Sequence, residues 1–324
     1  GLNECTGRGR AELLGIEFDH EKRRRKMPGI IASIIMSSMM KGKPNNTRYR
    51  PRDYEAVREQ ARKNSTRLSL PPNTLREKTP YGYWFCRPDS NRQKVIFYIH
   101  GGGFNSGSAE YSFNMARNFC KTSDYAVFNV EYRLAPEHPF PVGLEDCIRA
   151  YEWMLEKGIR GRDMVLAGDS AGGNLVFALA LYLRDLGIEL PAGLCGISPV
   201  GTLDESLPSR KERVDRDCII GADFTEEMQI TYIRDYDVKN PYLSPIYGDF
   251  TGLPPIWMCV GTEEVFYDDA FALRDAAQSK GIQVELLIGK GLCHVYPMFP
   301  DRQSIKAIKS MRSFIERCLL PLND

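Results

Sequence analysis

The sequence predicts an α/β fold with a mostly parallel, doubly wound sheet and helices on both of its faces. Short apolar runs rich in β-branched and aromatic residues recur along the chain, and stretches with helical spacing stand between them. Strands that alternate with helices favour a parallel sheet that is covered on both sides. The length of 324 residues is sufficient for one such domain with a full hydrophobic core.

The individual elements follow from these patterns. The apolar runs predict strands at residues 94–99, 126–130, 164–167, 194–198, 256–260 and 284–288. Helical spacing predicts helices at residues 142–157, 174–184 and 302–319, and an acidic first turn predicts a further helix that starts near residue 225. The apolar face of the last long helix is expected to pack on the sheet and consists of Ile305, Ile308, Met311 and Ile315.

A serine flanked by glycines is the most informative motif of the chain. Residues 168–172 read Gly-Asp-Ser-Ala-Gly and fit Gly-x-Ser-x-Gly, the tight strand-to-helix turn that exposes a serine hydroxyl. Glycines are needed on both sides because side chains there would keep the strand and the helix apart, and the serine backbone itself is strained. Ser170 is therefore the candidate nucleophile. The alternative is a flexible glycine turn in which the serine has no catalytic role.

A second glycine-rich motif lies about 70 residues upstream. Residues 100–104 read His-Gly-Gly-Gly-Phe and follow an expected central strand. Consecutive glycines leave backbone N–H groups that can approach a ligand closely. Such donors stabilise the oxyanion of a tetrahedral intermediate, and the loss of one raises the barrier by about 3–4 kcal/mol. The alternative is a hairpin or a flexible loop.

These motifs resemble those of the hormone-sensitive-lipase-like esterases among the α/β-hydrolases. A third string, Tyr-Arg-Leu-Ala-Pro-Glu-His-Pro-Phe-Pro at residues 132–141, is similar to the signature between their oxyanion loop and their nucleophile. The resemblance is strong from about residue 80 to 185, weaker toward the C-terminus and poor before residue 70. It implies an α/β-hydrolase fold with a helical cap, and oxyanion donors at the backbone N–H groups of Gly102, Gly103 and Ala171.

A serine hydroxyl needs a base to become a good nucleophile, and histidine is the usual one. The chain has four histidines. His20 lies in a charged stretch, His100 is expected to brace the glycine loop, and His138 belongs to the third string and is expected to be structural. His294 follows the strand expected at residues 284–288 and comes late in the chain, as the order serine, acid, histidine of this fold requires. His294 is therefore the predicted base, and the alternative is a packed loop histidine.

The acid should lie between Ser170 and His294, directly after a strand. The related esterases carry an acid three residues after the glycine that ends this strand, usually Asp followed by Pro-Leu. Here that position is Glu264, followed by Val-Phe, which departs from the common pattern although glutamate is accepted in this fold. Asp268 and then Glu263 are the alternatives. Asp268 is expected instead to start the next helix, where a carboxylate favours the positive end of the helix dipole.

The predicted function is that of a serine carboxylesterase for short-chain acyl esters, acetyl esters among them, acting through an acyl-enzyme. The short acyl chain is implied by the resemblance alone. No metal or organic cofactor is needed for this chemistry. The alternatives are an amidase, a lactonase or a peptidase with the same three residues, a long-chain lipase, and a non-catalytic ligand receptor of the same fold.

Composition excludes several other classes. The net charge of +1 gives no sign of a nucleic-acid partner, and no CxxC or HExxH motif points to a metal. The nine cysteines show no close pairing and favour a reduced, cytoplasmic setting. The expected partner is therefore a small-molecule ester. Because these folds often pair through an exposed element, a homodimer stays open as the assembly.

The N-terminal region predicts an amphipathic helix after a basic run. Ile30, Ile31, Ile34, Ile35 and Met39 recur at helical spacing, and the run is too short to span a bilayer. The resemblance favours residues 1–70 as the first part of the cap and the insertion 200–250 as the second, around a hydrolase core of residues 71–199 and 251–324. Packing on the core and contact with a membrane surface are the lesser alternatives for this helix.

Three tyrosines of the insertion are candidate pocket residues, although ordinary packing is the default for them: Tyr232, Tyr236 and Tyr242. The methionines of the N-terminal helix make it a further candidate for the lining of an acyl or alcohol pocket, since methionine-rich surfaces adapt to varied ligands.

Overall fold

A single mixed sheet forms the centre of the protein in the computed structural model, which describes residues 28–43, 48–65, 70, 72–111, 119 and 125–320. The strand order is β1-β2-β4-β3-β5-β6-β7-β8, and the sheet is parallel from β4 to β8. The strands are β1 (Leu75–Thr79), β2 (Gly82–Cys86), β3 (Asn91–Ile99), β4 (Tyr125–Val130), β5 (Met164–Asp169), β6 (Gly193–Ile197), β7 (Ile256–Gly261) and β8 (Val284–Gly289).

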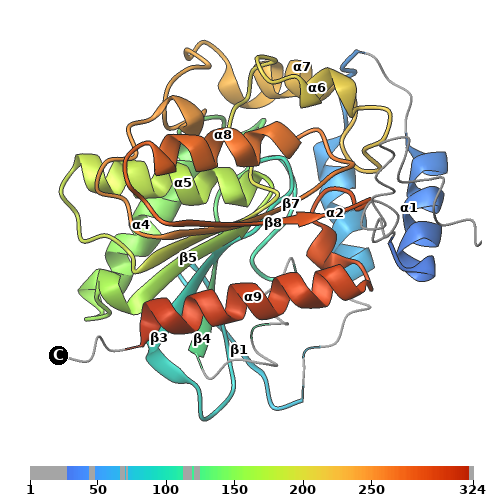
Figure 1. Cartoon of the computed structure of the whole chain (residues 1–324). Coiled ribbons are helices and arrows are strands. Elements are labelled where there is room, and N and C mark those ends of the chain that lie inside the picture. Colours follow the sequence, from blue (N-terminus) through green and yellow to red (C-terminus); the bar gives the residue numbers. More distant parts are fainter. Residues whose placement is uncertain are drawn as a thin grey trace, which may run out of the picture.

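Helices cover both faces of this sheet, as the sequence predicts (Figure 1). The longer helices are α1 (Ile30–Gly42), α2 (Tyr54–Ser65), α4 (Val142–Glu156), α5 (Ala171–Asp185), α8 (Tyr267–Gln278) and α9 (Arg302–Leu319). The shorter ones are α6 (Ser209–Glu212), α7 (Phe224–Met228) and the single turns Gly161–Asp163, Gln229–Ile233, Pro245–Tyr247 and Tyr296–Met298. Helices α4, α5 and α8 lie on one face and α9 lies on the other.

The core is divided by the sheet into two apolar layers, because successive side chains of a strand point to opposite faces. In β5, Met164 and Leu166 pack with α4 and α5, whereas Val165 and Ala167 pack with α9. All of β6 and β7 is buried, which explains why these strands read as continuous apolar runs.

Sequence patterns locate the parallel strands and the long helices well, and they miss the antiparallel hairpin of β1 and β2. Strand β1 reads Leu-Arg-Glu-Lys-Thr and is almost fully exposed, so it carries no apolar alternation that a pattern could detect. Strand β2 pairs antiparallel with both β1 and β4. The hairpin thus extends the sheet at the edge opposite β8.

The predicted packing of α9 is partly wrong. Met311 and Ile315 are buried, but Ile305 is 55% exposed. The buried stripe instead runs through Ala307 and Phe314, because the helix is rotated so that Ile305 lies beside this stripe and faces solvent. The prediction gave too much weight to the isoleucines and left Ala307 and Phe314 out of the buried face.

The N-terminal helix α1 forms as predicted, but its isoleucines are not its packing face. Ala32 is buried and Met36 packs on the core layer of α9, whereas Ile30, Ile31 and Ile34 are 81, 62 and 63% exposed. These three isoleucines therefore do not form the face that packs on the core. Within the described ranges, no helix combines the length and the apolar character needed to cross a bilayer.

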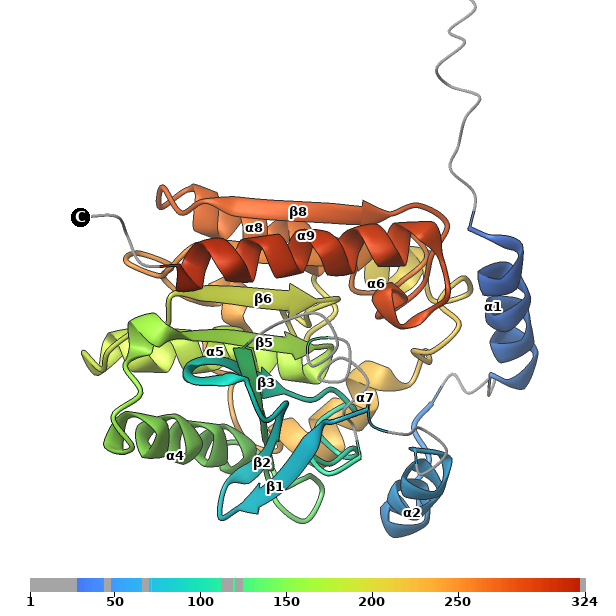
Figure 2. The ribbon, with the colours of Figure 1, turned by 90° about the horizontal axis from the view of Figure 1, so that it is seen from below.

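Helices α1 and α2 lie beyond the arrowheads of β5, β6 and β8, at the carboxyl edge of the parallel strands (Figure 2). Hydrogen bonds join this N-terminal segment to the insertion between β6 and β7. Lys43 donates to the carbonyl oxygen of Asp217 at 2.6 Å, Arg52 pairs with Asp223 at 2.7 Å, and the Tyr54 hydroxyl donates to Glu227.

Candidate active site

Ser170 stands in a strained turn at the end of β5. Its φ of 54° lies in the left-handed region, which a non-glycine residue adopts at a cost. The turn has no space for side chains beside it, since a Cβ on Gly172 would lie 2.0 Å from the Ile99 carbonyl oxygen and one on Gly168 2.5 Å from that of Gly172. The two glycines therefore allow α5 to begin against β3, and the serine is held where the strand meets the helix.

The side chains of Ser170, Glu264 and His294 form one chain of hydrogen bonds. His294 Nε2 lies 2.8 Å from Ser170 Oγ, and His294 Nδ1 lies 2.7 Å from Glu264 Oε2. The residues follow β5, β7 and β8, and the carboxyl ends of parallel strands share one edge of the sheet. All three are buried, with exposed fractions of 8, 0 and 2% in the order given.

Glu264 is held rigidly on its other side. Its Oε1 accepts hydrogen bonds from the Ser198 hydroxyl at 2.9 Å and from the Gly261 N–H at 2.5 Å. The Ser198 hydroxyl oxygen also accepts the Val295 N–H at 2.9 Å, so one serine connects the carboxylate to the loop that carries His294. Sequence reasoning missed Ser198, because a serine at the end of a buried strand has no motif around it.

The alternative acids make other contacts. Asp268 lies in the first turn of α8, as expected, and its Oδ2 accepts the Ser209 N–H at 2.8 Å. Glu263 forms an ion pair with Arg216 at 3.3 Å. The glutamate expected from the spacing after β7 is thus the carboxylate that contacts His294.

His100 and His138 lie apart from this chain of hydrogen bonds. His100 Nδ1 lies 2.8 Å from the Gly101 carbonyl oxygen, and its ring stacks on Tyr132 with a centroid distance of 4.3 Å. Burial lowers the pKa of His100 to about 4, so the ring is neutral and braces the loop. His138 is exposed on the surface. The prediction for His20 lies outside the described residues.

The electrostatics of His294 favour a base that is held in one orientation. Burial lowers its pKa, but the hydrogen bond and the negative charge of Glu264 outweigh burial, and the pKa is raised. Because Nδ1 contacts a carboxylate, it carries the proton of the neutral ring. Nε2 is then free to accept the Ser170 proton. The Phe266 ring stands edge-on at 5.0 Å from the imidazole and closes the site on that side.

The glycine loop after β3 is shaped by positive φ angles, of 124° at Gly102 and 60° at Gly103. A Cβ on Gly102 would lie 2.2 Å from the Ser106 carbonyl oxygen, so that position requires glycine. Asp169 fixes the start of the loop, because its Oδ1 accepts the Gly101 N–H at 3.1 Å. Ala171, the first residue of α5, has an N–H without an acceptor inside the helix.

Comparison with known proteins shows the same organisation. The model of the alpha/beta hydrolase fold family matches residues 96–298. The chain belongs to this family. It is 33% identical over 252 residues to an acetyl-hydrolase of Streptomyces hygroscopicus, and this match covers 76% of this chain and 84% of that protein. It is 31% identical to an esterase of Acinetobacter venetianus, and this match covers 66% of this chain and 71% of that protein. A hormone-sensitive lipase from a metagenome library superimposes with a TM-score of 0.83 and 29% identity, over 89% of this chain and 98% of that one. The predicted resemblance is thereby confirmed.

The described part of this α/β-hydrolase holds no group of three or more His, Cys, Asp or Glu side chains suited to a metal ion. Its insertion contributes aromatic packing close to the glycine loop. Tyr232 is buried and stacks on Phe104 at 4.0 Å, whereas Tyr236 is 47% exposed and Tyr242 donates to Asp185 on α5. Of the three candidate tyrosines, only Tyr232 thus contacts the loop that follows β3.

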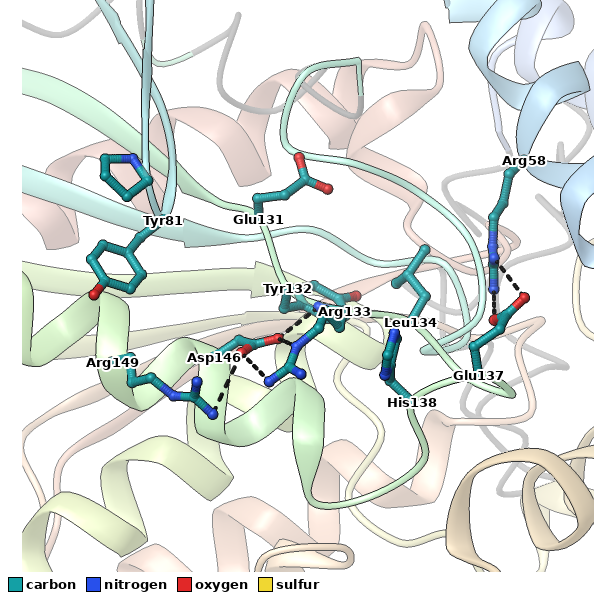
Figure 3. A pocket seen from close by; sticks show the side chains of 11 residues that line it. Arg58, Tyr81, Glu131, Tyr132, Arg133, Leu134, Glu137, His138, Asp146 and Arg149 are labelled. Atoms are coloured by element: carbon teal, nitrogen blue, oxygen red, sulfur yellow. Dashed lines mark hydrogen bonds and ion pairs between the residues drawn. The ribbon is translucent and has the colours of Figure 1, made fainter.

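A surface pocket of about 630 Å³ opens beside the segment that follows β4, between this segment, α4 and Arg58 of α2 (Figure 3). Its charged groups neutralise one another, since Arg58 pairs with Glu137 at 2.7 Å and Arg133 pairs with Asp146 at 2.9 Å. The residues that line it include none of the Ser170, Glu264 and His294 side chains. This pocket of the hydrolase therefore does not contain the candidate active site.

Proposed function

We propose that the protein is a serine carboxylesterase in which Ser170 is the nucleophile, His294 the general base and Glu264 the acid that orients it. The observation that carries this proposal is the continuous hydrogen-bonded chain from Ser170 Oγ through the His294 ring to Glu264. A strained serine beside a buried, carboxylate-bound imidazole is the arrangement that activates a hydroxyl for acyl transfer.

In the first step, His294 Nε2 takes the Ser170 proton while Oγ attacks the carbonyl carbon of the ester. The imidazolium that forms is stabilised by the Glu264 carboxylate, and it then gives its proton to the leaving alcohol. Water attacks the acyl-enzyme in the same way, with His294 again as the base. The backbone N–H groups of Gly102, Gly103 and Ala171 are the proposed donors to the oxyanion in both steps.

The proposed substrates are esters of short acyl chains, and acetyl esters in particular. This part of the proposal is supported by a relative that is named an acetyl-hydrolase and that matches three quarters of this chain. No cofactor takes part in any step.

We further propose that the N-terminal segment and the insertion 200–250 form a cap over the site. Their mutual hydrogen bonds and the position of α1 and α2 at the carboxyl edge of the sheet support this arrangement. A cap of this kind excludes water from the acyl transfer and limits the size of the substrate.

The test is an assay of p-nitrophenyl esters from acetate to palmitate, with the wild type and Ser170→Ala compared at equal concentration. We expect turnover to be highest at the short chains and to fall by several orders of magnitude in the variant. Circular dichroism shows whether the variant is folded. Turnover that survives in folded Ser170→Ala would contradict the assignment of the nucleophile, and a preference for palmitate would contradict the short acyl chain.

A further inference from the structure

Two reduced cysteines lie in direct contact beside the candidate active site. The sulfur atoms of Cys218 and Cys293 are 2.7 Å apart, and both side chains are buried, with exposed fractions of 4 and 0%. A disulfide bond is about 2.0 Å long, so the two atoms need to approach by only about 0.7 Å to be bonded. Among the cysteines in the described ranges, no other pair is joined by a hydrogen bond.

The two cysteines belong to segments that are distant in the sequence. Cys218 lies in the insertion between β6 and β7, and Cys293 directly precedes His294 in the loop after β8. A bond between them would therefore join the insertion to the loop that carries the proposed base. None of the acyl-transfer steps uses either thiol.

The backbone around Cys218 is held in place by its neighbour Asp217. The Asp217 carboxylate accepts the N–H groups of Ile219 and Ile220 at 2.9 and 3.0 Å, and its second oxygen accepts the Val265 N–H at 2.9 Å. Lys43 donates to the Asp217 carbonyl oxygen. Cys218 is thus positioned before any reaction, and the two sulfur atoms need to approach each other by less than about 1 Å.

We propose that Cys218 and Cys293 form an oxidative modification site, at which a hydroperoxide converts the two thiols to a disulfide that links the insertion to the His294 loop. One thiolate attacks the peroxide oxygen, and the O–O bond breaks to give a sulfenic acid and, with hydrogen peroxide, water. The second sulfur attacks the sulfenic sulfur and releases a second water. In total, two thiols and one peroxide give one disulfide and two waters, and a dithiol reverses the change by exchange.

The contact between the sulfurs also makes the two thiols unequal. The hydrogen bond with Cys293 lowers the pKa of Cys218 and raises the pKa of Cys293. The thiolate is the reactive form of cysteine. Because Cys218 is 4% exposed and Cys293 is 0% exposed, a peroxide reaches Cys218 more easily, and we expect Cys218 to be the attacking group and Cys293 to be the resolving group.

The disulfide should also slow turnover, an expectation that rests on the proposed function. The bond displaces the residue next to His294 and restrains the insertion. A displacement of about 1 Å of a reacting group lowers rates by up to about 100-fold. We expect kcat for p-nitrophenyl acetate to fall about tenfold on oxidation and to recover with a dithiol.

The experiment exposes the full chain to hydrogen peroxide, alkylates the remaining thiols and maps its peptides by mass spectrometry without reduction. We expect a cross-linked pair of peptides that contain Cys218 and Cys293, about 2 Da lighter than their sum because two hydrogens are lost. The cross-link should disappear after treatment with a dithiol and in Cys218→Ala. The matched control is Cys147→Ala, which removes a buried cysteine of α4 and should keep the cross-link.

The proposal is overturned if both thiols are still alkylated after peroxide, or if they appear only as separate sulfinic acids. A cross-link that leaves kcat unchanged overturns the effect on turnover. If Cys218→Ala does not fold, Cys218→Ser replaces it in the same assay. The mass measurement does not depend on activity, so a protein without esterase activity would refute the proposed function and leave this test intact.

Discussion

The Glu264 carboxylate and the His294 imidazole form the main electrostatic interaction of the site. Both are buried, so water screens their interaction little, and the carboxylate raises the pKa of the imidazole although burial alone would lower it. A base accepts a proton only when it is neutral. We therefore expect kcat/KM to rise with pH through the raised pKa of His294.

Replacement of Glu264 by glutamine tests this pair. Glu264→Gln removes the charge that raises the pKa of His294, while burial remains, so the acidic limb of the pH–rate profile should shift to lower pH. The amide also no longer selects the productive tautomer, and kcat should fall by about 10³–10⁴. The measurement is kcat/KM for p-nitrophenyl acetate between pH 5 and pH 9.

The matched control is Asp268→Asn, which neutralises a nearby carboxylate that accepts from the Ser209 backbone. It should leave the pH profile of the wild type in place and lower kcat far less. A larger loss in Asp268→Asn than in Glu264→Gln would show that the acid is wrongly assigned.

Spacing and residue type predicted the three residues that the structure brings into contact, because each follows a strand that the sequence displays clearly. Their catalytic roles stay predictions until the variants are assayed. Ser198 and Asp169 were not predicted as anchors of the site. Their contacts, with Glu264 and with the Gly101 N–H, depend on how neighbouring strand ends meet, and no short motif encodes that.

At the scale of the element, the turn between β5 and α5 shows why its glycines are necessary. Strand β3 lies beside β5, and the first turn of α5 passes directly over the end of β3. The contact is between backbone atoms, which cannot move aside as a flexible side chain can. The turn between β5 and α5 therefore accepts a side chain at Gly172 only if the helix is displaced.

Gly172→Ala measures this constraint. Its Cβ would lie 2.0 Å from the Ile99 carbonyl oxygen, so we expect the free energy of unfolding to fall by about 2–3 kcal/mol or more, and turnover to fall with it. The control is Gly42→Ala at the end of α1, where a Cβ would meet nothing within 4 Å and stability should stay within about 1 kcal/mol. Chemical denaturation of both variants gives the comparison. Equal stabilities would mean that the turn is more adaptable than the structure indicates.

At the scale of the whole molecule, a buried ion pair connects the insertion between β6 and β7 to the hydrolase core. Arg210 on α6 pairs with Asp269 on α8 at 2.8 Å, with side-chain exposures of 5 and 0%. The same guanidinium donates to the carbonyl oxygens of Thr202 and Val265 and lies over the Phe266 ring at 4.5 Å. Val265 and Phe266 directly follow Glu264 in the chain, so these contacts of Arg210 also hold the segment that carries the proposed acid.

Removal of Arg210 should therefore be costly. Arg210→Ala leaves the Asp269 carboxylate buried without its counter-ion, and we expect a loss of about 3–5 kcal/mol in the free energy of unfolding. The control Arg312→Ala breaks the exposed pair with Glu316 and should cost at most about 1 kcal/mol. Thermal and urea unfolding distinguish the two. A loss in Arg210→Ala no larger than in the control would show that the insertion is held by other contacts.

Sequence patterns were sufficient for the class of fold, for the succession of parallel strands and long helices along the chain, and for the three residues proposed for acyl transfer. Local spacing is sufficient for these, because strand, turn and helix signals act over a few residues. The folded structure decided the outward isoleucines of α1, the register of α9, and the contacts of Ser198 and of Cys218 with Cys293. Each of these depends on which surfaces meet in the folded chain, and residues far apart in sequence carry no local signal of that meeting.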